Sequence, residues 1–134
     1  MNKTDNVLSV LKGARFYLSD EANWAQGVGA EDAEGWEVHA TDASACKRCL
    51  TAAVSYAAYN LLASKQDDLD NLEHLPFSHD ALGVLDSVDK GPPTGMTTVR
   101  ERVVERNDHY ATEHDDILRW LDDAIRAREQ EAQK

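Results

Sequence analysis

The most reactive pair of side chains in the sequence is the C-x-x-C of Cys46 and Cys49, which encloses Lys47 and Arg48. We expect this motif near the start of an apolar helix over residues 43–63, where the helix dipole and two cations favour a thiolate. Such a pair would act as a thiol redox couple. A metal site is an alternative, but it needs two further ligands. The third interpretation is packing of two small side chains on a core helix.

We favour packing for the two cysteines, because thioredoxin-like chemistry needs a strand before the motif within a βαβ pattern. The sequence lacks that pattern, and it contains no second C-x-x-C that would complete a zinc site. We therefore predict no catalytic residues, no metal and no cofactor.

Asn107 and Asp108 form a second candidate site, because Asn107 falls on the apolar face that carries Val99 and Val103. A buried amide must find partners or costs roughly 1–3 kcal/mol. The pattern therefore predicts that Asn107 and Asp108 close their helix and bind backbone groups of the connection over residues 23–41. A polar pocket is the alternative.

The connection (residues 23–41) is rich in glycine and acidic side chains and contains two isolated tryptophans. Its residues 36–40 alternate in polarity, so we expect a short strand pair within it. Connections of this length often carry function. We take Trp24, Gln26 and Trp36 as candidate binding residues, because exposed tryptophans are frequent anchors of interfaces.

Apolar periodicity predicts helices on both sides of the connection. The predicted fold class is all-α: a compact bundle of five or six helices around the central alanine-rich helix. We expect one domain over residues 1–134, with a frayed C-terminal end after about residue 126. Four helices are expected over residues 5–21, 43–63, 66–75 (ended by Pro76) and 78–88 (capped by Ser78). A further helix is expected to begin at the capping box of Thr98 and Glu101, and the last helix at the similar pair of Thr112 and Asp115.

The composition limits the class of partner. The 134 residues include 25 acidic and 14 basic side chains, giving a net charge of -11. This excludes direct binding of nucleic acid or of an anionic membrane surface, and it favours a basic protein partner. No segment approaches the roughly 20 apolar residues of a membrane-spanning helix. The N-terminal residues lack a secretory signal, so we expect a cytoplasmic protein.

Three short motifs stand in a recognisable order. Residues 24–27 read W-A-Q-G, Cys46 opens the alanine-rich segment, and N-D at 107–108 precedes the last helix. This order resembles a family of small helical proteins of unknown function from actinobacteria and phages, with W-x-Q-G, C-x-x-G-A and W-N-D motifs. The chain departs from that pattern at C-L in positions 49–50 and at Arg106. The resemblance implies a compact helical domain in which the three motifs lie close together, and it implies no activity.

We therefore expect a small, acidic, cytosolic interaction protein without enzymatic activity. It would bind a basic or nucleic-acid-binding protein through its acidic surface or the connection. A narrower hypothesis is a phage or mobile-element accessory protein or inhibitor that occupies a nucleic-acid-binding groove on its target. One alternative is a small-ligand-binding or enzymatic domain with a pocket near Trp24, Cys46 and Asn107-Asp108. The other is a thiol redox module, and homo-oligomerisation stays open.

Overall fold

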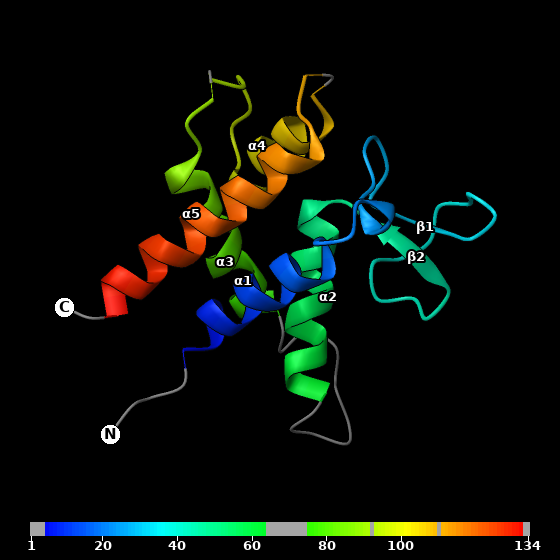
Figure 1. Cartoon of the computed structure of the whole chain (residues 1–134), viewed down its shortest axis with the longest axis horizontal. Helices are drawn as coiled ribbons and strands as arrows, with labels where there is room; N and C mark the ends of the chain where they lie inside the picture. Colours follow the sequence, from blue (N-terminus) through cyan, green and yellow to red (C-terminus); the bar gives the residue numbers. More distant parts are fainter. Residues whose placement is uncertain (1–4, 64–74, 92, 110, 133–134) are drawn as a thin grey trace.

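The all-α class is confirmed by the computed structural model, which describes residues 5–63, 75–91, 93–109 and 111–132. Within these residues the chain forms five α-helices and one two-stranded sheet (Figure 1). The helices are α1 (Asn6–Tyr17), α2 (Leu50–Ala63), α3 (Leu75–Val88), α4 (Val99–Asp108) and α5 (His114–Ala132). The strands are β1 (Ala30–Asp32) and β2 (Ala45–Arg48), and a short 3-10 helix, η1 (Glu21–Asn23), follows α1.

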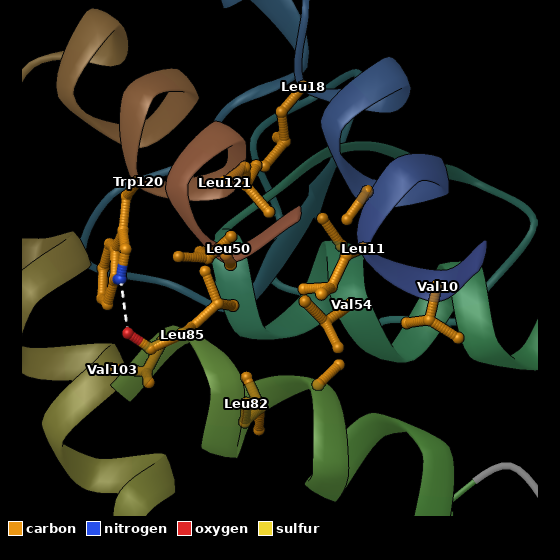
Figure 2. Packing of buried hydrophobic residues seen from close by; sticks show 14 of the residues in the cluster. Val10, Leu11, Leu18, Leu50, Val54, Leu82, Leu85, Val103, Trp120 and Leu121 are labelled. Atoms are coloured by element: carbon orange, nitrogen blue, oxygen red, sulfur yellow. Dashed lines mark hydrogen bonds between the residues drawn. The ribbon is translucent and has the colours of Figure 1, made fainter. Parts of the chain in front are cut away.

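All five helices contribute buried side chains to the hydrophobic core. Helix α3 packs against α1, α2, α4 and α5, whereas α2 packs against α1, α3 and α4. Figure 2 shows leucines from four helices meeting in this core, and all of them are fully buried: Leu11, Leu50, Leu85 and Leu121. Trp120 closes one side, and its indole Nε1 donates to the carbonyl of Leu85 at 2.7 Å. None of the described helices combines the length and the apolar character needed to cross a membrane.

The start of α2 differs from the prediction, because residues 45–48 form a strand. β2 pairs antiparallel with β1, with Ala30 opposite Arg48, and the ladder is irregular after Glu31. Residues 45–48 are therefore paired in the sheet, and the helix begins at Leu50. The expected strand pair is present with β1 in the connection, but its partner comes from the segment predicted to be helical. Residues 36–40 contribute an isolated bridge to β1.

The start of α3 also differs from the prediction. Pro76 is the second residue of this helix, whereas the prediction placed it directly after a helix. Proline is tolerated in the first turn of a helix, where an N–H group has no partner within the helix. Ser78, predicted as an N-cap, is buried within α3. Residues 66–74 of the helix predicted over 66–75 lie outside the described residues.

The capping of the last two helices agrees with the prediction at α4 and differs at α5. The backbone N–H of Glu101 donates to the hydroxyl of Thr98 at 3.1 Å, and the Glu101 carboxylate accepts from the Thr98 N–H at 3.3 Å. At α5, the carboxylate of Asp116 accepts from the N–H of Glu113 at 2.9 Å. The predicted pair that begins with Thr112 is therefore wrong.

Helix α5 continues beyond the point where fraying was predicted. It extends to Ala132, and ion pairs hold its last turns against α1. The guanidinium of Arg128 lies 2.9 Å from the carboxylate of Asp5, and Lys12 lies 3.5 Å from Glu129. The charged side chains after residue 126 thus contact the first helix, which explains why the helix persists.

Candidate functional site

Asn107 is fully buried at the end of α4, and its side chain joins three parts of the chain. Its Oδ1 accepts from the indole Nε1 of Trp24 at 2.9 Å and from the N–H of Leu50 at 3.1 Å. Its Nδ2 donates to the carbonyl of Ala25 at 3.1 Å and to the carboxylate of Asp108 at 2.8 Å. These bonds use every donor and acceptor position of the amide. The prediction that Asn107 points inward and binds the connection is confirmed.

Gln26 and Asp108 extend the same contact. The Nε2 of Gln26 faces two carbonyls at the end of α4, which a helix terminus leaves without intrahelical partners, and a third carbonyl in the loop before α5. They belong to Asn107, His109 and Thr112, at 3.0, 3.3 and 3.2 Å. The carboxylate of Asp108 accepts from the N–H of Gly27 at 2.9 Å. Gly27 has a φ of 83°, a conformation that glycine adopts without strain.

Four of the sequence-predicted residues therefore meet at one place, and they form a hydrogen-bonded contact: Trp24, Gln26, Asn107 and Asp108. The half-buried ring of Trp24 also lies 5.9 Å from the ring of His114. The clefts that we find on the described surface, of about 310 to about 560 Å³, are lined by other residues. The polar atoms of these four side chains thus bond one another and nearby backbone groups.

Arg48 is a key residue that the sequence analysis missed. It lies on β2 and is 3% exposed. Its Nε donates to the carbonyl of Ala40 at 2.5 Å, its Nη2 to that of Asp42 at 3.3 Å, and its Nη1 to the Tyr17 hydroxyl at 3.0 Å. Its guanidinium carbon lies 3.6 Å from the ring centre of Tyr56, a cation–π contact. Arg48 therefore fastens the sheet to α1 and α2.

Little in the local sequence around Arg48 indicates this role. A basic residue beside an alanine-rich segment looks like part of the polar face of a helix, because helical periodicity places exposed charges there. The signal that would find it is the pair of tyrosines at 17 and 56, each of which offers an aromatic face to a buried cation. That signal needs the tertiary fold to bring the tyrosines together.

Residues 30–48, which we call the arm, extend to one side of the helical body (Figure 1). Trp36 stands on a tight turn of the arm and is 70% exposed. The carboxylate of Asp32 accepts from the N–H groups of Glu34 and Trp36, both at 2.9 Å. Gly35 completes the turn with a φ of 87°, which glycine adopts readily. The turn therefore holds the backbone of Trp36 in one conformation.

The arm is acidic. Residues 30–48 contain five acidic and two basic side chains. One of the basic side chains, Lys47, lies 4.0 Å from Glu31. Hydrogen bonds from the side chain and backbone of Ser44 lower the pKa of Asp42 below its ordinary value of 3.8, so this carboxylate is charged at neutral pH. The exposed surface around the turn is therefore negative.

The two cysteines are free and lie in different surroundings. Cys46 is exposed on β2, with its Sγ 3.6 Å from the carbonyl of Ser44. Cys49 is buried directly before α2, with its Sγ 3.1 Å from the hydroxyl of Thr51. The prediction that both pack on a core helix is wrong for Cys46, because residues 45–48 form a strand. Across the described ranges no group of His, Cys, Asp and Glu side chains is arranged to hold a metal ion.

These observations define a small helical domain with an acidic arm fastened to it by buried polar contacts. A family model matches residues 2–127, so the chain belongs to DUF6197, a family of unknown function. The membership confirms the resemblance to a family of unknown function that the sequence motifs indicate. No curated protein and no solved structure matches the chain.

Proposed function

We propose that this protein is a non-enzymatic interaction protein, and that its arm binds a basic protein partner with Trp36 as the anchor. The observation that carries the proposal is the 70% exposure of a tryptophan on a turn held by the Asp32 carboxylate. Tryptophan is enriched among the residues that dominate binding energy. A turn already ordered in the free protein lowers the entropy cost of binding.

The charge around Trp36 indicates the chemistry of the partner. Glu34 and Glu37 flank it on the exposed side of the turn, and the whole chain carries a net charge of -11. A negative field of this kind attracts a basic surface and speeds its association. Nucleic-acid-binding proteins present such surfaces. The arm therefore suits an accessory protein of a phage or mobile element that occupies the nucleic-acid-binding groove of its target.

The buried contacts have a positioning role in this proposal. Trp24, Gln26 and Asn107 fix the start of the connection on α4, and Arg48 fixes β2 on α1 and α2. The arm is thus held at both of its ends, and Trp36 lies between them. Of the five residues considered as binding candidates, Trp36 contacts the partner, and the other four orient the arm: Trp24, Gln26, Asn107 and Asp108.

The proposal is tested by affinity capture from a host lysate with the tagged protein, followed by mass spectrometry. We expect the wild type to retain a basic protein at low salt and to release it at high salt, because screening weakens interactions between exposed charges. Trp36→Ser should lose the partner. Met96→Ser is the matched control, because Met96 is an exposed apolar side chain outside the arm. Equal capture by Trp36→Ser, or a partner indifferent to salt, would contradict the proposal.

Once a partner is purified, association kinetics separate the two parts of the proposal. Glu34→Gln with Glu37→Gln removes charge at the rim of the interface, and rim charges act mainly on the association rate. Trp36→Ser removes the anchor, and losses of this kind appear mainly in the dissociation rate. The opposite assignment of the two effects would show that the tryptophan is not the anchor.

A further inference from the structure

A groove of about 560 Å³ lies between α1 and α2, beside the arm and outside it. Its floor is made by a close approach of the two helices. A Cβ added at Gly13 would lie 3.2 Å from the Cβ of Ala57, so only the smallest residue fits there without displacing a neighbour. No bulky side chain therefore fills the groove at this crossing.

The walls of the groove are aromatic. Tyr17 and Tyr56 lie in an edge-to-face arrangement, with ring centres 5.6 Å apart and an angle of 62° between the rings. Phe16 stands at the rim and is 82% exposed. A phenylalanine this exposed loses most of the apolar burial that would stabilise it within the chain. The groove thus combines an open floor with an apolar side chain that a ligand would cover.

We infer that this groove is a second docking site, and that its occupant is an amphipathic helix with a cationic polar face, supplied by the partner of the arm. A helix satisfies its own backbone hydrogen bonds, so it needs from a groove only apolar surface for one face. The groove adjoins the arm through Tyr17, whose hydroxyl accepts from Arg48 and lies 3.4 Å from the carbonyl of Cys46 on β2. Tyr17 therefore belongs both to the wall of the groove and to the contact that holds β2.

Charge favours a cationic helix over a second copy of this acidic chain. Asp20 lines the groove, and the whole chain carries a net charge of -11. Two cations of α1 pair with carboxylates of α5: Lys12 lies 3.5 Å from Glu129, and Arg15 lies 2.9 Å from Asp122 and also donates to the Ser19 hydroxyl at the groove. The net negative charge of the chain repels a second copy and attracts a cationic segment. The inference rests on the proposed function for the cationic character of the partner, but its test does not require that partner.

The probe is a synthetic peptide of leucine and lysine whose leucines recur at helical spacing on one face. It is titrated into the isotope-labelled full chain at low and high salt, and amide shifts are followed by NMR. A peptide of the same composition with shuffled order controls for non-specific attraction to an acidic protein. We expect the patterned peptide to shift the amides of Gly13, Phe16, Tyr17, Tyr56 and Ala57, and the shuffled peptide to leave them unchanged.

Phe16→Ser should weaken binding of the patterned peptide roughly 10- to 100-fold, the range expected for losing one buried aromatic side chain. Because Phe16 is so exposed, the variant should keep the fold of the wild type, and its amide spectrum verifies this. Met96→Ser should bind like the wild type. Equal affinity for Phe16→Ser, or equal binding of the shuffled peptide, would overturn the inference.

Two further measurements separate the alternatives. Sedimentation of the free protein reports self-association: a dimer that strengthens with salt and is lost in Phe16→Ser would mean that a second copy occupies the groove, and would overturn the inference. Groove binding of the peptide should persist in Trp36→Ser. If Trp36→Ser still binds the peptide in the groove and also still captures the lysate partner, the proposal for the arm fails and the inference about the groove is supported. If Trp36→Ser loses that partner and Phe16→Ser binds the peptide like the wild type, the inference about the groove fails and the proposal for the arm is supported.

Discussion

Replacing Asn107 by leucine tests whether the buried amide holds the connection against the helices. Leucine is similar in size but offers neither donor nor acceptor. The substitution leaves the N–H of Leu50, the carbonyl of Ala25 and the indole N–H of Trp24 without the partner seen in the structure. Leu50 is 0% and Ala25 is 4% exposed, so water does not readily replace the lost bonds.

The expected loss is large relative to the stability of a domain. A buried polar group without a partner costs about 1–3 kcal/mol, so the two buried backbone groups cost roughly 2–6 kcal/mol, and the half-buried indole adds about 1 kcal/mol. Additional apolar burial by leucine offsets about 1 kcal/mol of this. We expect a net loss of about 2–6 kcal/mol, against a typical total of about 5–15 kcal/mol.

The assay is urea unfolding at neutral pH, followed by circular dichroism. Asn60→Leu is the matched control, because Asn60 is exposed on α2 and undergoes the same chemical change. Its effect should stay within about 0.5 kcal/mol, as for most surface substitutions. Asn107→Asp keeps both acceptor bonds but places a second carboxylate beside Asp108, so its loss should be smaller in acid, where the new carboxyl regains a proton. A loss for Asn107→Leu no greater than that of Asn60→Leu would refute the reasoning.

Three other substitutions and one pH dependence test the remaining contacts. Gly35→Ala should lower stability by about 1–2 kcal/mol, because the positive φ strains an L side chain, whereas Gly83→Ala in the open interior of α3 should raise it by about 0.5–1 kcal/mol; calorimetry measures both. Arg48→Met should cost about 1–3 kcal/mol and change the near-ultraviolet dichroism of the tyrosines it contacts; an unchanged spectrum would contradict the cation–π arrangement. Burial acts to raise the pKa of Asp5, but hydrogen bonds from Arg128 and from backbone N–H groups bring it below the ordinary 3.8. The stability from this pair is therefore complete above about pH 4 and is lost as the pH falls further, so Asp5→Asn should flatten the acid side of the melting-temperature profile, and an unaltered profile would count against the pair.

The helices that bury one apolar face in the core, such as α1 and α5, were predictable from sequence. The apolar spacing of Val7, Leu11 and Ala14 in α1 matches their burial, and the same holds for Ile117 and Leu121 in α5. These faces repeat with the helical period, so local sequence contains the information. The capping box of α4 was predictable for the same reason, since its two partners lie three residues apart.

The start of α2 was not predictable from local pattern. Ala45 and Cys46 continue the apolar, alanine-rich character of the helix that follows, so helical propensity extends across the true boundary. What makes residues 45–48 a strand is the pairing of β2 with β1, in which Ala45 lies opposite Asp32, and the burial of Arg48, and both depend on residues distant in sequence. Strand propensity depends on context in this way more than helix propensity does.

The buried contacts of Asn107 were predictable from sequence, but the exposure of the two tryptophans was not. A polar residue on an apolar helical face indicates a buried network, and Asn107 follows this rule. No comparable rule applies to the two tryptophans of the connection, because the local sequence around each is compatible with burial in the core and with exposure to solvent. Trp24 is half-buried against Asn107 and Trp36 is 70% exposed, and only the tertiary contacts decide between them.

The long reach of the Asn107 hydrogen bonds has a consequence for the order of folding. They join residues 83, 82 and 57 positions apart in the chain. Closing loops of this length costs conformational entropy before the hydrogen bonds form, so we expect these contacts to form after the folding transition state. Substitution at Asn107 should then speed unfolding and leave the folding rate nearly unchanged. During synthesis the arm leaves the ribosome well before α4, so Trp36 is exposed on a segment that lacks the Asn107 contacts until α4 has followed.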